Sequence, residues 1–330
     1  MISVVLALLT AASNATASVL QRRAASQTQS TKALGGISLI GQLIRKRVWL
    51  AGVGMVVVAS LLQAGALATG PIALVQPIFI VELPLTLLLS SWVWHRKLSG
   101  RTWGAVVLVT VSLGAGLAAA QPSGAGNTAS TGLWILALIA TAGFEAALIL
   151  TALRVNGEPR AALLGLAAAC GYALTAALMK EAVAALDRGV VAFFETWQLY
   201  GVAIAGVGSL FLLQNALQAG TLAATQPTLT VGDALISITY GVMLFDEHLR
   251  LGWWLIPEII ALILIVVGYI EIAKSPVAME HDESEPSPTV EAADEAQAAP
   301  SGAGDAGGVD SARLRADGSW ADGSSSERQP

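Results

Sequence analysis

The sequence contains little charge. Only 12% of its 330 residues are Asp, Glu, Lys or Arg, whereas about a quarter of the residues in an ordinary soluble domain are charged. Hydrophobic residues make up 55% of the chain. This composition excludes an ordinary soluble domain and is typical of a protein that lies within a lipid bilayer.

The sequence also lacks the residues from which disulfides, metal sites and nucleotide-binding loops are built. Cys170 is its single cysteine, so one chain cannot form a disulfide. The three histidines, His95, His248 and His281, lack the spacing of a zinc site. There is no Walker loop, and the one Gly-x-Gly-x-x-Gly pattern, at 302–307, follows no predicted strand. We therefore expect no enzyme, no cofactor and no nucleic acid partner.

Acidic residues are concentrated in the C-terminal part. Residues 276–330 contain twelve of the 23 acidic residues but only three of the 18 basic ones. This stretch is rich in Pro, Ser, Ala and Gly, so it cannot bury enough apolar surface to fold. We expect a disordered acidic tail without a membrane span.

Long apolar segments make up most of the remaining sequence. Because the hydrocarbon core of a bilayer is about 30 Å thick, a spanning helix needs roughly 20 mostly apolar residues. Nine segments qualify, near residues 2–20, 48–69, 71–94, 102–120, 132–153, 161–180, 196–218, 220–245 and 252–273. The shorter amphipathic segment from Lys32 to Arg47 is predicted to lie on the membrane surface. The sequence therefore predicts an all-α, multi-pass membrane protein.

Basic residues predict the orientation of these segments. Arg22 and Arg23 follow the first apolar segment, whereas a signal peptide carries its basic residues before the apolar core, so we expect a retained first helix. One set of alternate loops contains twelve basic residues: Arg22, Arg23, Lys32, Arg45, Lys46, Arg47, Arg96, Lys97, Arg101, Arg154, Arg160 and Lys274. The other set contains Lys180, Arg188 and Arg250. Since basic loops favour the cytoplasm, we expect a cell-membrane protein with its N-terminus outside and its tail inside.

An internal repeat divides the chain. The stretch LATGPIALVQP at 67–77 matches LQAGTLAATQP at 217–227 at an offset of 150, and beyond the proline an offset of 151 aligns Glu82 with Asp233. Five predicted spans separate the starts of the two copies, so the second copy enters the bilayer from the opposite side. The repeat predicts a first unit of four helices at 1–120, a linking fifth helix at 121–160, an inverted second unit at 161–275 and the tail at 276–330.

Glu82 and Asp233 are the main candidate site residues. Each is expected in the middle of a span, where an ionisable side chain costs about 2.5 to 3.5 kcal/mol and normally faces a cavity or a partner. In secondary transporters, helices interrupted by proline at matching positions of an inverted repeat indicate a substrate site near the midplane. The structural alternative is that each carboxyl group, in its protonated form, only hydrogen-bonds a neighbouring helix.

Other residues complete the predicted site. Proline removes a backbone donor and exposes a carbonyl one turn earlier, which is tolerated at that depth beside a cavity. We predict a substrate or ion site made of Glu82, Asp233, Gln76, Gln226 and Glu145, with hinges at Pro77, Pro84 and Pro227. If the substrate is a metal ion, Glu82 and Asp233 are its expected ligands.

Four stretches resemble a known family. They are ASNATASVLQRRAA at 12–25, GPIALVQPI at 70–78, WHRKLSGRTWG at 94–104 and LQAGTLAATQPTL at 217–229. They are similar to the corresponding stretches of the drug/metabolite transporter superfamily of EamA type, and within it to the NIPA-type magnesium transporters. In that family an acidic residue usually precedes a leucine after the third helix, as Glu247 does in the second half here, whereas the first half has Arg96 and Lys97.

The sequence and the resemblance together predict a secondary transporter that works by alternating access and moves a small cation such as magnesium. One alternative is a proton-coupled exporter of a small metabolite or drug. Another is a non-transporting membrane scaffold whose cytoplasmic tail binds a partner. The expected partners are the lipid bilayer and a small cation or metabolite, and both a monomer and a homo-oligomer remain open.

Overall fold

The computed structural model describes residues 1–26, 46–95, 97–124, 126, 128–250 and 252–274. All of them belong to one compact unit, Met1–Glu285. They contain helices and no β-strand beyond one isolated bridge between Ser123 and His248, which confirms the all-α prediction. Most of the predicted surface helix at 32–47 and the whole acidic tail at 276–330 lie outside the described residues.

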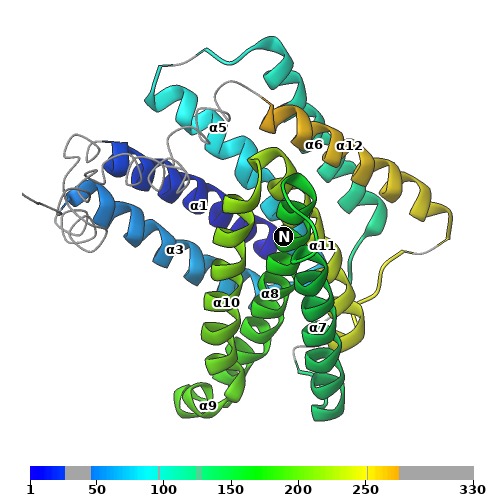
Figure 1. Ribbon diagram of the computed structural model, residues 1–330. Helices are drawn as coiled ribbons and strands as arrows, with labels where there is room; N and C mark the ends of the chain where they lie inside the picture. The colour runs from blue at the N-terminus through cyan, green and yellow to red at the C-terminus, as the bar shows by residue number, and fades with distance from the viewer. Residues whose placement is uncertain (27–45, 96, 125, 127, 251, 275–330) are drawn as a thin grey trace, which may run out of the picture. The chain divides into compact units, whose positions relative to one another are not determined.

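The helices follow one another closely along the chain (Figure 1). In the first half they are α1 (Ile2–Ser26), α3 (Arg47–Thr69), α4 (Ile72–Ile78), the 3₁₀ turn η1 (Phe79–Val81), α5 (Glu82–Val93) and α6 (Gly100–Ala120). Next come α7 (Thr131–Ala152), α8 (Glu158–Ala184), η2 (Ala185–Arg188) and α9 (Val190–Glu195). The last are α10 (Trp197–Ala219), α11 (Leu222–Phe245), η3 (Gly252–Trp254) and α12 (Leu255–Ala273).

Nine helical spans in the described part of the chain are long and apolar enough to cross a membrane. They coincide with the nine predicted segments, and α4, η1 and α5 together form the third. Large apolar side chains such as Ile139, Ile204 and Phe211 are exposed on these helices. Such apolar faces are favourable against lipid acyl chains and unfavourable against water. A helix also forms all of its backbone hydrogen bonds internally, as the interior of a bilayer requires. The protein is therefore a multi-pass membrane protein.

The third span is broken, whereas its counterpart in the repeat is not. Pro77 is the penultimate residue of α4, and Pro84 lies in the first turn of α5, where a helix has no use for its backbone N–H. In contrast, α11 continues through Pro227. A single proline removes one helical hydrogen bond and can be accommodated by a kink. Two prolines seven residues apart divide the third span into two helices, so the expectation of matching interruptions was wrong for α11.

The helix contacts follow a similar order in the two halves of the chain. In the first half α1 packs against α3 and also against α4 and α5. In the second half α8 packs against α10 and also against α11. Between the halves, α6 packs against α12 and α4 against α11. Figure 1 shows α1 beside α3 and α6 beside α12.

The buried apolar side chains form clusters that position the broken span. One cluster surrounds Trp134, Leu178 and Phe245 and includes residues of α4, α7, α8 and α11. Another contains Ile80 of η1 and Tyr269 of α12, together with side chains of α5, α6 and α11. Because the second cluster encloses η1, it fixes the place at which α5 and its first residue, Glu82, begin.

Candidate functional site

The structure places both Glu82 and Asp233 inside the helix bundle. Glu82 is the first residue of α5, and Asp233 lies near the middle of α11. The two acidic side chains are close enough to interact electrostatically. Packed helices surround both of them, yet each keeps some accessible surface. The two acids that the repeat aligns therefore line the interior of the helix bundle together.

Glu82 is held by contacts from its own helix and from α1. The side-chain amide of Asn14 donates a hydrogen bond to Glu82 Oε2 at 3.1 Å. The hydroxyl of Thr86, one turn further along α5, donates to the backbone oxygen of Glu82 at 2.8 Å. As the first residue of α5, Glu82 also lies at the positive end of that helix dipole, which favours a carboxylate.

Asp233 has polar neighbours of its own. The hydroxyl of Ser237, one turn later in α11, donates a hydrogen bond to Asp233 Oδ1 at 3.4 Å. Tyr172 of α8 interacts electrostatically with both Asp233 and Glu82. Side chains from α1, α5, α8 and α11 thus lie around the two acids, and the sequence analysis did not predict Tyr172 or Ser237 because neither carries a charge.

The backbone just before Glu82 is anchored to α12. The buried hydroxyl of Tyr269 donates a hydrogen bond to the backbone oxygen of Ile80 at 2.7 Å. Thr230 of α11 lies close to the same hydroxyl. Tyr269 also interacts electrostatically with Glu82. Three separate helical segments therefore meet at the turn from which Glu82 projects.

The structure does not join the remaining predicted residues to the carboxylate pair by hydrogen bonds. Gln76 is buried in α4, and its Nε2 has no hydrogen-bond partner in the described part of the chain. Gln226 is partly exposed on α11. Glu145 of α7 lies close to α8, since a Cβ atom added to Gly171 would be 3.3 Å from its Oε1. Glu145 is thus directed at α8 beside Cys170, with which it interacts electrostatically.

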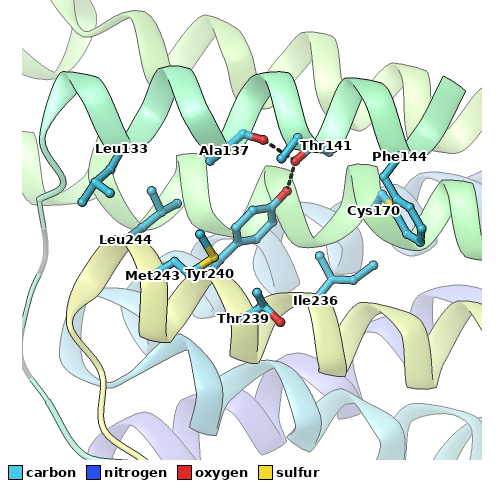
Figure 2. A pocket seen from close by; sticks show the side chains of 11 residues that line it. Leu133, Ala137, Thr141, Phe144, Cys170, Ile236, Thr239, Tyr240, Met243 and Leu244 are labelled. Atoms are coloured by element: carbon cyan, nitrogen blue, oxygen red, sulfur yellow. Dashed lines mark hydrogen bonds between the residues drawn. The ribbon is translucent and has the colours of Figure 1, made fainter. Parts of the chain in front are cut away.

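A pocket of about 220 Å³ lies between α7, α8 and α11 (Figure 2). Its lining residues are Leu133, Ala137, Ala140, Thr141, Phe144, Cys170, Ile236, Thr239, Tyr240, Met243 and Leu244. The lining is mostly apolar, and the hydroxyl groups of Thr141 and Tyr240 hydrogen-bond to each other. Neither Glu82 nor Asp233 lines this pocket. The pocket therefore does not give water or a substrate access to the two carboxyl groups.

A buried ion pair was missed by the sequence analysis. Lys180 was expected in an exterior loop, but it lies inside α8 with 1% of its side chain exposed. Its ammonium group lies 3.2 Å from Glu247 Oε1 and donates to the backbone oxygen of Gly70 at 2.8 Å. The loop prediction failed because α8 extends to Ala184, beyond the end of its most apolar stretch. Lys180 is therefore removed from the second set of loop charges.

Glu247 of this pair caps the start of α4. Its carboxylate accepts hydrogen bonds from the backbone N–H groups of Ile72 at 2.7 Å and Ala73 at 2.9 Å. The residue before α4, Pro71, provides no side-chain cap, so these N–H groups need an acceptor from elsewhere. Gly241 makes the approach possible, because a Cβ atom there would lie 2.3 Å from Glu247 Oε2.

The described residues contain no group of three or more His, Cys, Asp or Glu side chains that could hold a metal ion. A divalent cation at Glu82 and Asp233 would therefore keep several of its water molecules. Mg²⁺ is usually bound in this way, through one or two carboxylates and retained water.

Comparisons with known proteins give one distant relative. An uncharacterized protein of Corynebacterium glutamicum is 24% identical over 277 residues, which cover 83% of this chain and 96% of the relative. No protein-family model matches the chain, and no solved structure matches it. The similarity extends over almost all of the relative, whose name states no activity.

Proposed function

We propose that the protein is a secondary transporter of the drug/metabolite type, which moves a small cation by alternating access. The observation that carries this proposal is the pair formed by Glu82 and Asp233, two enclosed acids from different halves of the chain that interact with each other. Ionisable groups inside a membrane span are costly, and they mark substrate or ion pathways in transport proteins.

The helix contacts also support this function. In inverted-repeat transporters the substrate site lies between the repeats, and one repeat moves against the other. Here α4 of the first half packs against α11 of the second half, the two helices whose sequences match. Asp233 lies on α11, and Glu82 follows α4 after the turn η1. A relative movement of the two halves would therefore alter the distance between Glu82 and Asp233 and the access to them.

Magnesium is the first candidate substrate because of the resemblance to the NIPA-type transporters. The chemistry of the pair fits a hydrated divalent cation, since it provides oxygen ligands and negative charge without a closed cage. Asn14 orients the carboxylate of Glu82, and Tyr172 lies near both acids.

Proton-coupled export of a small metabolite or drug is the second candidate. It is favoured by the lack of any lysine or arginine among the described residues that interact with the pair. An enclosed carboxyl group without a basic partner can take up and release a proton. The same two acids would then form the proton relay.

The experiment that tests both candidates is flux through the purified protein in liposomes. A panel of divalent cations, organic cations and small metabolites is supplied with and without a pH gradient. Uptake of Mg²⁺ that does not depend on the pH gradient supports cation transport, whereas flux of a metabolite that collapses with the gradient supports exchange for protons.

The first prediction concerns the two acids in this assay. Glu82→Gln and Asp233→Asn should each reduce flux to the level of empty liposomes, because the amide keeps the side-chain shape but removes the charge. Membrane insertion should persist, since a neutral side chain enters the bilayer more easily. The double variant should add little, as expected for groups that act as a unit.

Glu271→Gln provides the matched control. Glu271 pairs with Arg101 at 2.6 Å on an exposed part of the bundle, and its amide variant should transport normally. Flux close to that of the unmodified protein in both single variants, at equal abundance, would refute the proposed site.

A further inference from the structure

The turn that precedes Glu82 has an unusual hydrogen-bond arrangement. In an α-helix the backbone oxygen of a residue accepts from the N–H four residues later. Ile80 lies in the 3₁₀ turn η1; if an α-helix continued through this turn, the donor to Ile80 would have to be Pro84, which has no N–H. Instead, the hydroxyl of Tyr269 donates to the backbone oxygen of Ile80 at 2.7 Å. A side chain of α12 thus provides a donor that Pro84 cannot provide.

Loss of the hydrogen bond from Tyr269 would cost free energy of folding. Ile80 is buried, and a buried carbonyl without a donor costs free energy comparable to that of a lost hydrogen bond. Tyr269 is also buried. Its hydroxyl therefore connects α12 to η1.

The hydrogen bond between Tyr269 and Ile80 is close to Glu82 in the chain, so it can affect the direction of the Glu82 side chain. Glu82 follows Ile80 by two residues and begins α5 immediately after η1. The direction of its side chain depends on the backbone of η1, which is a short 3₁₀ turn with weaker hydrogen bonds than an α-helix. Asn14 hydrogen-bonds to Glu82, and the other groups that interact with Glu82 electrostatically are Tyr172, Asp233 and Tyr269.

We propose that Tyr269 is a positioning residue for the carboxylate site: by hydrogen-bonding the backbone oxygen of Ile80 it holds the break between α4 and α5 and so directs Glu82 toward Asp233. This inference rests on the proposed function of the pair. Tyr269 acts through the backbone, because its hydroxyl donates to the backbone oxygen of Ile80.

The test removes the hydroxyl of Tyr269 and then introduces a backbone N–H at residue 84 as an alternative donor to Ile80. Tyr269→Phe removes the hydrogen bond and keeps the ring. Pro84→Ala in the same chain returns an N–H to residue 84, which can donate to Ile80. Tyr240→Phe is the matched control, since it removes another buried tyrosine hydroxyl that is bonded to Thr141 instead.

Two measurements are made on each variant in liposomes. One is the labelling rate of Glu82 by dicyclohexylcarbodiimide, measured by mass spectrometry with Asp233 in the same sample as internal reference. The other is the half-saturating concentration of Mg²⁺ for flux, measured separately from the maximal rate. The labelling requires no transported substrate, so it tests the role of Tyr269 even if the flux assay overturns the proposed function.

We expect Tyr269→Phe to change the Glu82 labelling rate and the half-saturating concentration by at least about threefold, as loss of an ordinary hydrogen bond would. Tyr269→Phe with Pro84→Ala should return both values toward those of the unmodified protein, and Tyr240→Phe should leave them unchanged. Unchanged labelling in Tyr269→Phe, or a double variant as impaired as the single one, would overturn the proposal. If Tyr269→Phe does not accumulate in the membrane, recovery of abundance in the double variant supports it and failure of the double variant overturns it.

Discussion

Lys180 and Glu247 are charged side chains inside an apolar helix bundle, and their stability depends on the completeness of their contacts. Glu247 receives two backbone N–H groups in addition to the ammonium group of Lys180. Lys180 reaches the backbone oxygen of Gly70 and lies 5.2 Å from the ring centre of Phe245. Removal of one member leaves the other charge buried without its partner, which is the costly change for such pairs.

Lys180→Met should therefore lower the free energy of unfolding in detergent by about 3 to 5 kcal/mol. Glu247→Gln should also destabilise the protein, and the double variant should be less destabilised than the sum of the two single variants. The comparison pair is Arg101 and Glu271, which is exposed and should show a much weaker coupling than the buried pair. Equal coupling energies for the two pairs would contradict the structural role of the buried pair.

At the residue scale the sequence predicted the two acids but not their surroundings. Glu82 and Asp233 were found because each is a charge in an apolar segment and the repeat aligns them. Tyr172 and Tyr269 could not be found in that way, since a tyrosine in an apolar helix costs little and carries no charge pattern. The position of Lys180 was predicted wrongly because its partner, Glu247, is 67 residues away in the sequence. Without knowledge of that contact, a buried, paired lysine cannot be distinguished from a lysine in a loop.

At the scale of the helices, the broken third span and the continuous α11 should differ in their local dynamics. The 3₁₀ turn Phe79–Val81 has poorer hydrogen-bond geometry than an α-helix, whereas α11 is helical throughout residues 222–245. We expect the amides of residues 79–83 to exchange with deuterium faster than those of residues 230–234, as measured by mass spectrometry in liposomes. The central part of α8 is the slow reference, and equal protection of the two stretches would contradict this expectation.

The sequence predicted the spans well because their signal is strong. About twenty apolar residues are needed to cross a bilayer, and no other element of this length is compatible with lipid. The helix break was harder to predict. Pro77 and Pro227 occupy equivalent positions of the repeat, but only the first is followed by a second proline in the same span. The response of the backbone to one proline depends on neighbouring helices, which the sequence of one span does not contain.

At the scale of the whole molecule the orientation in the membrane is a prediction from loop charges. The structure removes Lys180 from the second set of loops, which leaves Arg188 and Arg250 against the twelve basic residues of the first set. The contrast that favours a cytoplasmic location for the first set is thereby increased.

Single cysteines test this orientation. Cys170, the single native cysteine, is buried and is first replaced by Ala. Gly100→Cys introduces a thiol at a position where a Cβ atom meets nothing within 4 Å, and Thr128→Cys introduces one in the exposed segment before α7. A membrane-impermeant maleimide should label the thiol at position 128 in intact cells and the thiol at position 100 only after permeabilisation. The reverse pattern would show that the orientation is inverted.

The hydrogen bond from Tyr269 to Ile80 also constrains the order in which the sequence can change over time. While Pro84 is present, loss of the hydroxyl at position 269 removes the hydrogen bond that the buried oxygen of Ile80 accepts from a side chain. If Pro84 is replaced first, the new N–H makes the hydroxyl redundant, and position 269 becomes free to drift. An intermediate that has lost the Tyr269 hydroxyl but keeps Pro84 has neither of these two donors for the backbone oxygen of Ile80. Only the path in which Pro84 is replaced first avoids this intermediate.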